Sequence, residues 1–179
     1  IAALAASLCI DAGFQAALMA PTEILAEQHF EKISQWLKPL GIRLVWLAGR
    51  QKTKERNESL EAIANGEAQL IVGTHALIQE KVRFAKLGLA IVDEQHRFGV
   101  AQRLALRQSH NDGMPHLLML SATPIPRTLA MSYLADLDVS VIDELPAGRQ
   151  PITTKLVSMN RKTEVMAVIN QQVSEGRQV

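Results

Sequence analysis

Two adjacent carboxylates, Asp93 and Glu94, follow the apolar run Leu89–Val92 and precede Gln95 and His96. A carboxylate that ends a buried strand can hold Mg²⁺, directly or through water, and its neighbour can polarise an attacking water molecule. An isolated pair of this kind is more often only a helix cap and first-turn acid. The spacing differs from H-E-x-x-H and no second histidine or cysteine follows nearby, so zinc is not expected.

Four other clusters of polar or turn-forming residues also follow short apolar runs. Thr22, Thr74 and His75 stand where helices are expected to begin, and residues in such places are usually only caps. Free N–H groups at helix N-termini also bind phosphate, and Gly49–Arg50 combines a tight turn with a bidentate phosphate donor. Together these clusters predict a track for the phosphates of a nucleic-acid backbone. The candidate nucleic-acid-binding residues are Pro21, Thr22, Glu23, Gly49, Arg50, Gly73, Thr74 and His75.

The last cluster is Ser121, Ala122 and Thr123, directly before Pro124. Short hydroxyl side chains in this setting ordinarily close a local turn. The alternative is a hydrogen-bonded relay that connects the Asp93–Glu94 pair to the next helix.

Apolar periodicity places these clusters at the ends of strands. Strands are predicted at residues 15–20, 43–48, 69–72, 87–92, 116–120 and 139–142, with a minor strand at 82–84. Helices are predicted at residues 2–12, 21–40, 52–65, 100–109 and 126–134. Strands that alternate with helices indicate a parallel α/β sheet covered on both faces. Ligands of such sheets bind beyond the carboxyl ends of the strands, so the clusters should share one edge.

Some apolar residues carry specific expectations about burial. Residues 2–12 are apolar nearly all round, which predicts a helix buried on every side. Trp36 is expected in the core beneath its helix and Trp46 in the core beneath its strand, and neither is expected to stack on nucleic-acid bases.

The chain is expected to hold one domain and the start of a second. Residues 1–142 form the predicted first domain, and residues 143–151, rich in proline and glycine, the linker. Residues 152–179 predict a strand at 152–158 and a helix at 161–175, the first βα unit of the second domain. Residue 1 already lies inside a helical pattern with no cap before it, so we expect a fragment of a longer protein.

Composition narrows the class of protein only modestly. Of 179 residues, 47% are hydrophobic and 21% charged, and the net charge is +1, so nucleic-acid binding would need a local surface. The single Cys9 cannot form an internal disulfide, which suggests a reducing compartment. The first 20 residues lack a basic start and contain Asp11 and Gly13, which argues against a signal peptide or membrane span.

The clusters together resemble the motifs of superfamily 2 helicases. APTEILAEQH is similar to motif Ia, VGTHALIQ to motif Ib, IVDEQHRFG to a DExH-type motif II and LSATPIPRTLA to motif III. Within the superfamily, HRFGV and TPIPRTLAM are typical of bacterial branched-DNA helicases and of transcription-repair coupling translocases. The glutamine of DEQH and the run DLDVSVIDELPAGRQPI favour the branched-DNA group.

This resemblance implies a RecA-like domain of the P-loop NTPase type that uses ATP and Mg²⁺. By analogy, Asp93 would bind Mg²⁺ and Glu94 would activate the hydrolytic water. Gln95 and His96 would couple the nucleotide site to the residues 121–123 and to a partner domain. The candidate nucleic-acid residues would lie along branched DNA, such as stalled forks or Holliday junctions, in recombination and repair. The expected location is the bacterial cytoplasm, with no membrane partner.

One departure from the helicase pattern is the missing phosphate loop. No G-x-x-x-x-G-K-[ST] occurs in the sequence, and this motif supplies the backbone cradle and lysine for the phosphates. We therefore expect the first strand and P-loop, the rest of the second RecA-like domain and a wedge domain to lie elsewhere in a longer chain. The 179-residue chain alone is expected not to hydrolyse ATP. Besides the coupling translocase, a non-catalytic DNA- or protein-binding module is an alternative.

Overall fold

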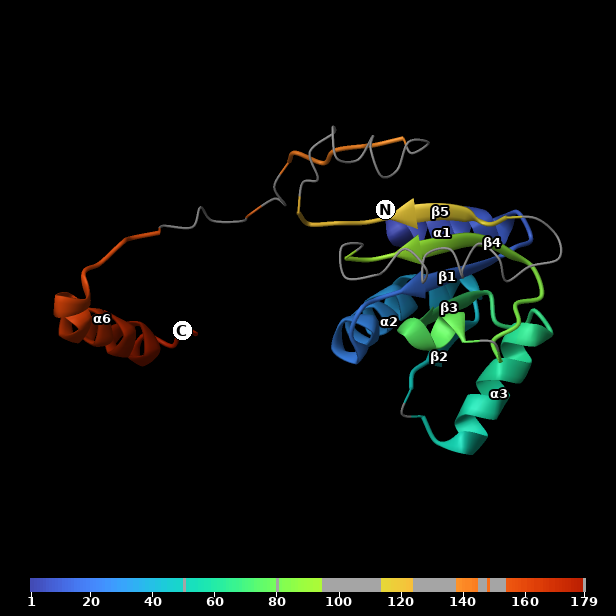
Figure 1. The fold of residues 1–179 in the computed structure, drawn as a ribbon, viewed down its shortest axis with the longest axis horizontal. Coiled ribbons are helices and arrows are strands. Elements are labelled where there is room, and N and C mark those ends of the chain that lie inside the picture. Colours follow the sequence, from blue (N-terminus) through green and yellow to red (C-terminus); the bar gives the residue numbers. More distant parts are fainter. Residues whose placement is uncertain are drawn as a thin grey trace. The chain divides into compact units, whose positions relative to one another are not determined.

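Five short apolar segments of the sequence pair into one parallel β-sheet in a computed structural model of the protein (Figure 1). The structure describes residues 1–49, 51–79, 81–94, 114–123, 138–144, 148 and 154–178. The chain divides into two units, Ile1–Leu129 and Ala130–Val179, and each is described by itself.

The first unit contains the sheet and its covering helices. The strands are β1 (Gln15–Met19), β2 (Leu44–Leu47), β3 (Leu70–Gly73), β4 (Leu87–Val92) and β5 (His116–Met119). The helices are α1 (Ala2–Asp11), α2 (Glu23–Leu37) and α3 (Thr53–Ala64), with short 3₁₀ turns η1 (Lys38–Leu40) and η2 (His75–Ile78). The strand order is β2-β3-β1-β4-β5 and every pair is parallel. The predicted strands from 15–20 to 116–120 are therefore confirmed, except for the minor strand.

Alternating side chains divide the core between the two faces of the sheet, because successive residues of a strand point in opposite directions. One face is covered by α1 and α2. It buries, among others, Ala16 and Leu18 of β1, Val72 of β3 and Ile91 of β4, packed against Ala6, Ile10, Ile33 and Leu37 of the helices.

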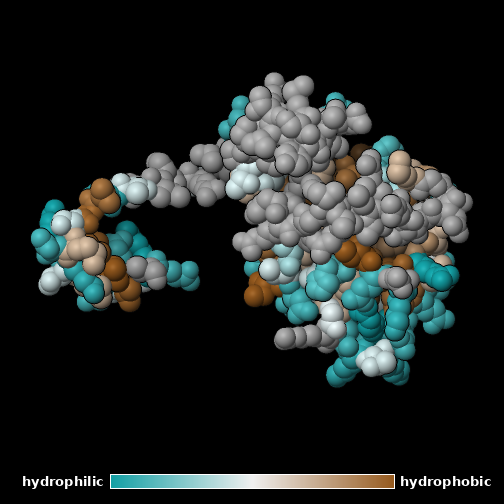
Figure 2. All heavy atoms as spheres, viewed as in Figure 1, coloured by the Kyte–Doolittle hydropathy of each residue, from teal (hydrophilic) through white to brown (hydrophobic). Residues whose placement is uncertain are grey.

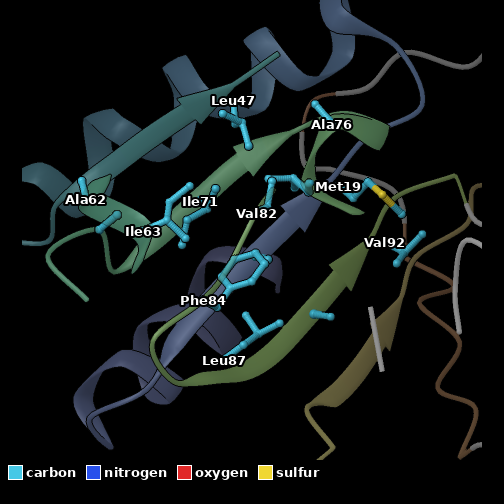
Figure 3. Packing of buried hydrophobic residues seen from close by; sticks show 14 residues of the cluster. Met19, Leu47, Ala62, Ile63, Ile71, Ala76, Val82, Phe84, Leu87 and Val92 are labelled. Atoms are coloured by element: carbon cyan, nitrogen blue, oxygen red, sulfur yellow. The ribbon is translucent and has the colours of Figure 1, made fainter. Parts of the chain in front are cut away.

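The opposite face is covered by α3 and η2. Its cluster includes Ala17 and Met19 of β1, Ile71 of β3 and Val92 of β4, together with Ile63 of α3 and Leu77 of η2. Figure 3 shows part of this cluster, including Met19, Ile71 and Val92 of the strands and Ile63 of α3. Phe84 and Leu87 belong to the same cluster. Hydrophilic residues cover the outer side of α3 in Figure 2. The predicted α/β sheet with helices on both faces is confirmed.

Two burial predictions are wrong. Helix α1 is not buried all round: Leu4 and Leu8 are about 70% exposed, because the helix lies along one face of the sheet and contacts it on one side only. Trp36 is 53% exposed on α2, where Lys32 Nζ lies 5.8 Å from its ring centroid. Trp46 is partly buried and packs against the core, and its ring meets Phe30 edge-on at 5.8 Å between centroids.

Two strand predictions before residue 143 are also wrong. Residues 82–84 form no strand, although Val82 and Phe84 are buried, so their apolar character reflects packing rather than pairing. Residues 139–142 form no strand either, and the side chains of Val139, Val141 and Ile142 are exposed. The predicted helices at 100–109 and 126–134 lie outside the described residues.

The described part of the second unit contains one 3₁₀ turn, η4 (Met159–Arg161), followed by the helix α6 (Lys162–Ser174). The helix predicted at 161–175 is confirmed, whereas residues 154–158 are not a strand. Arg161 pairs with Glu164 at 2.6 Å, which lowers the pKa of this carboxyl group. None of the described helices is long and apolar enough to cross a bilayer.

Candidate functional site at the carboxyl edge of the sheet

The last residues of all five strands are in register. Met19 of β1 aligns with Gly73 of β3 and with Val92 of β4, Leu47 aligns with Gly73, and Val92 aligns with Met119. The residues that follow these positions must therefore emerge along one edge of the sheet. This edge gathers all five predicted clusters, as far as their residues are described.

Asp93 is held at this edge by hydrogen bonds on both sides of its carboxylate. Its backbone N–H donates to Met19 O at 2.9 Å, which extends the β1–β4 pairing by one residue. Its Oδ1 accepts from the Glu94 N–H at 3.0 Å. Its Oδ2 lies 2.7 Å from His29 Nε2 of α2. The Asp93 side chain is 20% exposed, so the carboxylate is oriented by the protein yet still open to solvent.

His29 was not singled out from the sequence, although a signal for it exists. Leu89, Ile91 and Asp93 alternate toward the face that α2 covers. His29 stands seven residues, or about two helical turns, after the N-cap Thr22, so the two residues lie on the same side of α2. The two periodicities together predict a contact between His29 and Asp93, but only once it is known which face of the sheet α2 covers.

Glu94 has an unusual backbone. Its φ is 51°, the only positive φ of a non-glycine residue in the described part of the chain. This left-handed conformation costs a side-chain-bearing residue about 1 kcal/mol or more. The side chain is half-buried, with Oε2 shielded from solvent. Residues with strained backbones cluster at functional sites, and Glu94 is such a residue directly beside Asp93.

The donor set of this edge fits Mg²⁺. Magnesium can be held by a single protein carboxylate and completes its shell with water and substrate phosphates, and Asp93 supplies a carboxylate that is oriented by the protein and partly open to solvent. No group of three or more metal-ligating side chains occurs among the described residues.

The end of β1 leads directly into helix α2. Thr22 is the N-cap, with extended backbone, and its Oγ1 accepts a hydrogen bond from Leu25 N at 3.3 Å. Pro21 precedes it and Glu23 occupies the first turn. Thr22 and Glu23 are exposed, so the N-terminus of α2 is accessible at the edge.

The end of β2 is braced by three side chains that sequence reasoning missed. Gln51 donates to Trp46 O at 3.0 Å and accepts from Ala48 N at 3.2 Å. Arg56 of α3 donates to Ala48 O at 3.0 Å and to Gln79 Oε1 at 2.7 Å. Arg56 thus links the turn that contains Gly49 to the segment after η2. Arg50 lies outside the described residues.

The end of β3 is packed closely against β2. A Cβ on Gly73 would lie 2.1 Å from Leu47 O, so only glycine fits beside β2 at this position. Thr74 is 2% exposed, and its Oγ1 has no hydrogen-bond partner within the described residues. His75 follows and is exposed.

The end of β5 forms a local turn. Leu120 N donates to Val92 O at 2.9 Å, which sets Ser121 beside the Asp93 end of β4. Ser121 Oγ lies 3.0 Å from Thr123 Oγ1 and accepts from Thr123 N at 3.3 Å. Ser121, Ala122 and Thr123 are exposed. The turn interpretation is confirmed, and the relay stays a prediction. Gln95 and His96 lie outside the described residues.

The sheet order and the acidic edge define a RecA-like helicase domain, and comparison with known proteins agrees. The family model described as DEAD/DEAH box helicase matches residues 1–132. The chain belongs to this family.

Comparison with individual proteins gives a more specific similarity than the family model does. It is 58% identical over 99% of its length to the ATP-dependent DNA helicase RecG of Pasteurella multocida, and 59% identical over 99% to that of Haemophilus influenzae. It covers 26% of each of these relatives, about a quarter of their length. A structure of RecG bound to a three-way DNA junction superimposes with a TM-score of 0.77 at 42% identity, over 92% of this chain and 22% of that one.

Proposed function

We propose that the chain is part of an ATP-dependent DNA helicase that remodels branched DNA, such as stalled forks and Holliday junctions, in bacterial recombination and repair. The observation that carries this proposal is the register of the five strand ends, which brings the Asp93–Glu94 pair and the nucleic-acid candidates to one edge. The similarity to RecG along 99% of the chain supports the choice of branched DNA over other substrates.

The carboxylates divide the chemistry of ATP hydrolysis between them. Asp93, oriented by His29 and by the Glu94 N–H, would hold Mg²⁺, which neutralises charge on the phosphates when bound. Glu94, half-buried and adjacent, would accept a proton from the attacking water. Gln95, His96 and the turn 121–123 would transmit the state of this site to a second RecA-like domain.

The neighbouring strand ends would contact DNA. The exposed N-terminus of α2 at Thr22, the turn at Gly49 and the segment Gly73–His75 would offer N–H groups to a phosphate backbone. Arg50 lies outside the described residues, and its residue type would add a guanidinium to this set. Such contacts fix the position of the duplex without reading its sequence. Choice of branch structure would fall to a wedge domain elsewhere in the longer protein, which we expect in the bacterial cytoplasm.

ATPase assays of the full-length protein test this proposal. We expect hydrolysis to rise more with forked DNA than with linear duplex of equal length. Glu94→Gln should lower the DNA-stimulated rate by about 100-fold or more, because the general base is lost while the shape is kept. Glu58→Gln, on the exposed side of α3, is the matched control and should leave the rate unchanged.

The alternatives predict different results in the same assay. Equal stimulation by linear and forked DNA, together with capture of RNA polymerase, would favour a transcription-repair coupling translocase. Full-length protein that binds DNA but hydrolyses no ATP would favour a non-catalytic module. The 179-residue chain alone is expected to be inactive, and an activity of this chain that Glu94→Gln removes would contradict that expectation.

A further inference from the structure

We propose that His29 is a positioning residue for the Asp93 carboxylate, a role that rests on the proposed function. The imidazole Nε2 of His29 and Oδ2 of Asp93 are 2.7 Å apart, across 64 positions of sequence. This distance is at the short end for a hydrogen bond to a carboxylate, where such bonds are strongest.

The two hydrogen bonds of Asp93 act on different oxygens. Oδ1 accepts from the Glu94 backbone and Oδ2 from His29, so together they fix the rotation of the carboxylate plane. The backbone bond alone would leave the carboxylate free to turn about the Cβ–Cγ bond, because that torsion has a broad and shallow profile. His29 is therefore the described side chain that sets which lone pairs face outward.

The helix that carries His29 is well fixed. Ala26 and Ile33, three residues before and four residues after His29, are 0% and 4% exposed, so this side of α2 faces the sheet. The neighbouring Phe30 packs edge-on against Trp46 of β2. The imidazole thus projects from a well-packed helix, and such a helix is needed to position the Asp93 carboxylate precisely.

The role requires an N–H donor and no charge. A neutral imidazole with its proton on Nε2 can donate to Asp93 Oδ2 across the 2.7 Å that separates the two atoms. A glutamine side chain can place an N–H near the position of Nε2, whereas leucine fills similar space without a donor. This pair of substitutions separates hydrogen bonding from packing.

The experiment compares His29→Leu and His29→Gln in the full-length protein. Each variant is measured for kcat of DNA-stimulated ATP hydrolysis and for the Mg²⁺ concentration that half-saturates binding of a fluorescent ATP analogue. Loss of a group that orients a metal ligand typically costs about 10- to 100-fold in affinity or activity. We expect His29→Leu to lower kcat about 10-fold and to raise the half-saturating Mg²⁺ several-fold, and His29→Gln to recover most of both.

The control is Glu31→Leu, an exposed residue of the same helix, which should match the wild type. Equal loss in His29→Leu and His29→Gln, or no loss in either, would overturn the positioning role while leaving the proposed function intact if the wild type is active. A wild-type protein without DNA-stimulated hydrolysis would instead overturn the proposed function, and this role with it.

Discussion

The two edges of the same sheet treat their polar groups in opposite ways. At the amino edge, Gln15 is 3% exposed. Its amide donates to Ile63 O at 3.0 Å and to Ala68 O at 2.6 Å, and accepts from Lys86 N at 2.9 Å. Every polar atom of this side chain is used within the fold. Such complete pairing is what stability requires of a buried amide.

At the carboxyl edge, polar groups are held in place, but their hydrogen-bonding capacity is not fully satisfied within the described residues. The Thr74 hydroxyl is buried without a partner in the described part of the chain, Glu94 has a left-handed backbone, and Asp93 is partly open to solvent. A buried hydroxyl without a hydrogen-bond partner and a strained backbone both lower the stability of the fold. The amino edge therefore stabilises the sheet, while the carboxyl edge gives up stability and leaves the Asp93 carboxylate open to a ligand.

Substituting Gln15 should have the largest effect on stability at the amino edge. Gln15→Ala removes three hydrogen bonds and leaves Ile63 O, Ala68 O and Lys86 N buried or half-buried without this partner. We expect a loss of about 3 kcal/mol in the free energy of unfolding, measured by urea denaturation. ATPase activity per folded molecule, assayed at low temperature, should be unchanged. A stable Gln15→Ala protein with impaired hydrolysis would show that the amino edge also serves function.

Gly73 tests how closely the carboxyl edge is packed. Gly73→Ala forces a Cβ against Leu47 O, a backbone atom that cannot move aside without shifting β2. We expect a cost of about 2 kcal/mol, seen as a lower midpoint of thermal unfolding. Gly49→Ala is the matched control: its nearest contact would be Glu23 Oε1 at 3.8 Å, an ordinary distance. Similar midpoints for the two variants would contradict the close approach of β2 and β3.

Two threonines provide the finest test, because one hydroxyl is paired and the other is not. Thr22→Ala removes the cap of α2 and should cost about 1 kcal/mol. Thr74→Val replaces an unpaired buried hydroxyl by a methyl group of similar size and should change stability by less than about 0.5 kcal/mol. A marked loss of stability in Thr74→Val would mean that this hydroxyl serves the fold.

Local pattern explains what sequence analysis predicted correctly. The strands β1 to β5 and the helices α1 to α3 and α6 follow from apolar periodicity and from turn residues such as Gly13 and Gly66, both of which have positive φ. Predictions of burial failed where the exposure of a side chain depends on which side of its helix faces the sheet. Trp36 and Leu8 are apolar, yet each lies on the side of its helix that faces away from the sheet.

Residue type and spacing along the chain are enough to specify the alternation of strands and helices, the family, and the five clusters that end the strands. The side chains that support these clusters become visible only once the chain is folded. His29 reaches Asp93 across 64 residues, and Arg56 reaches Gln79 across 23. Contacts of this length depend on strand order and on which face each helix covers, and periodicity along one segment does not contain that information.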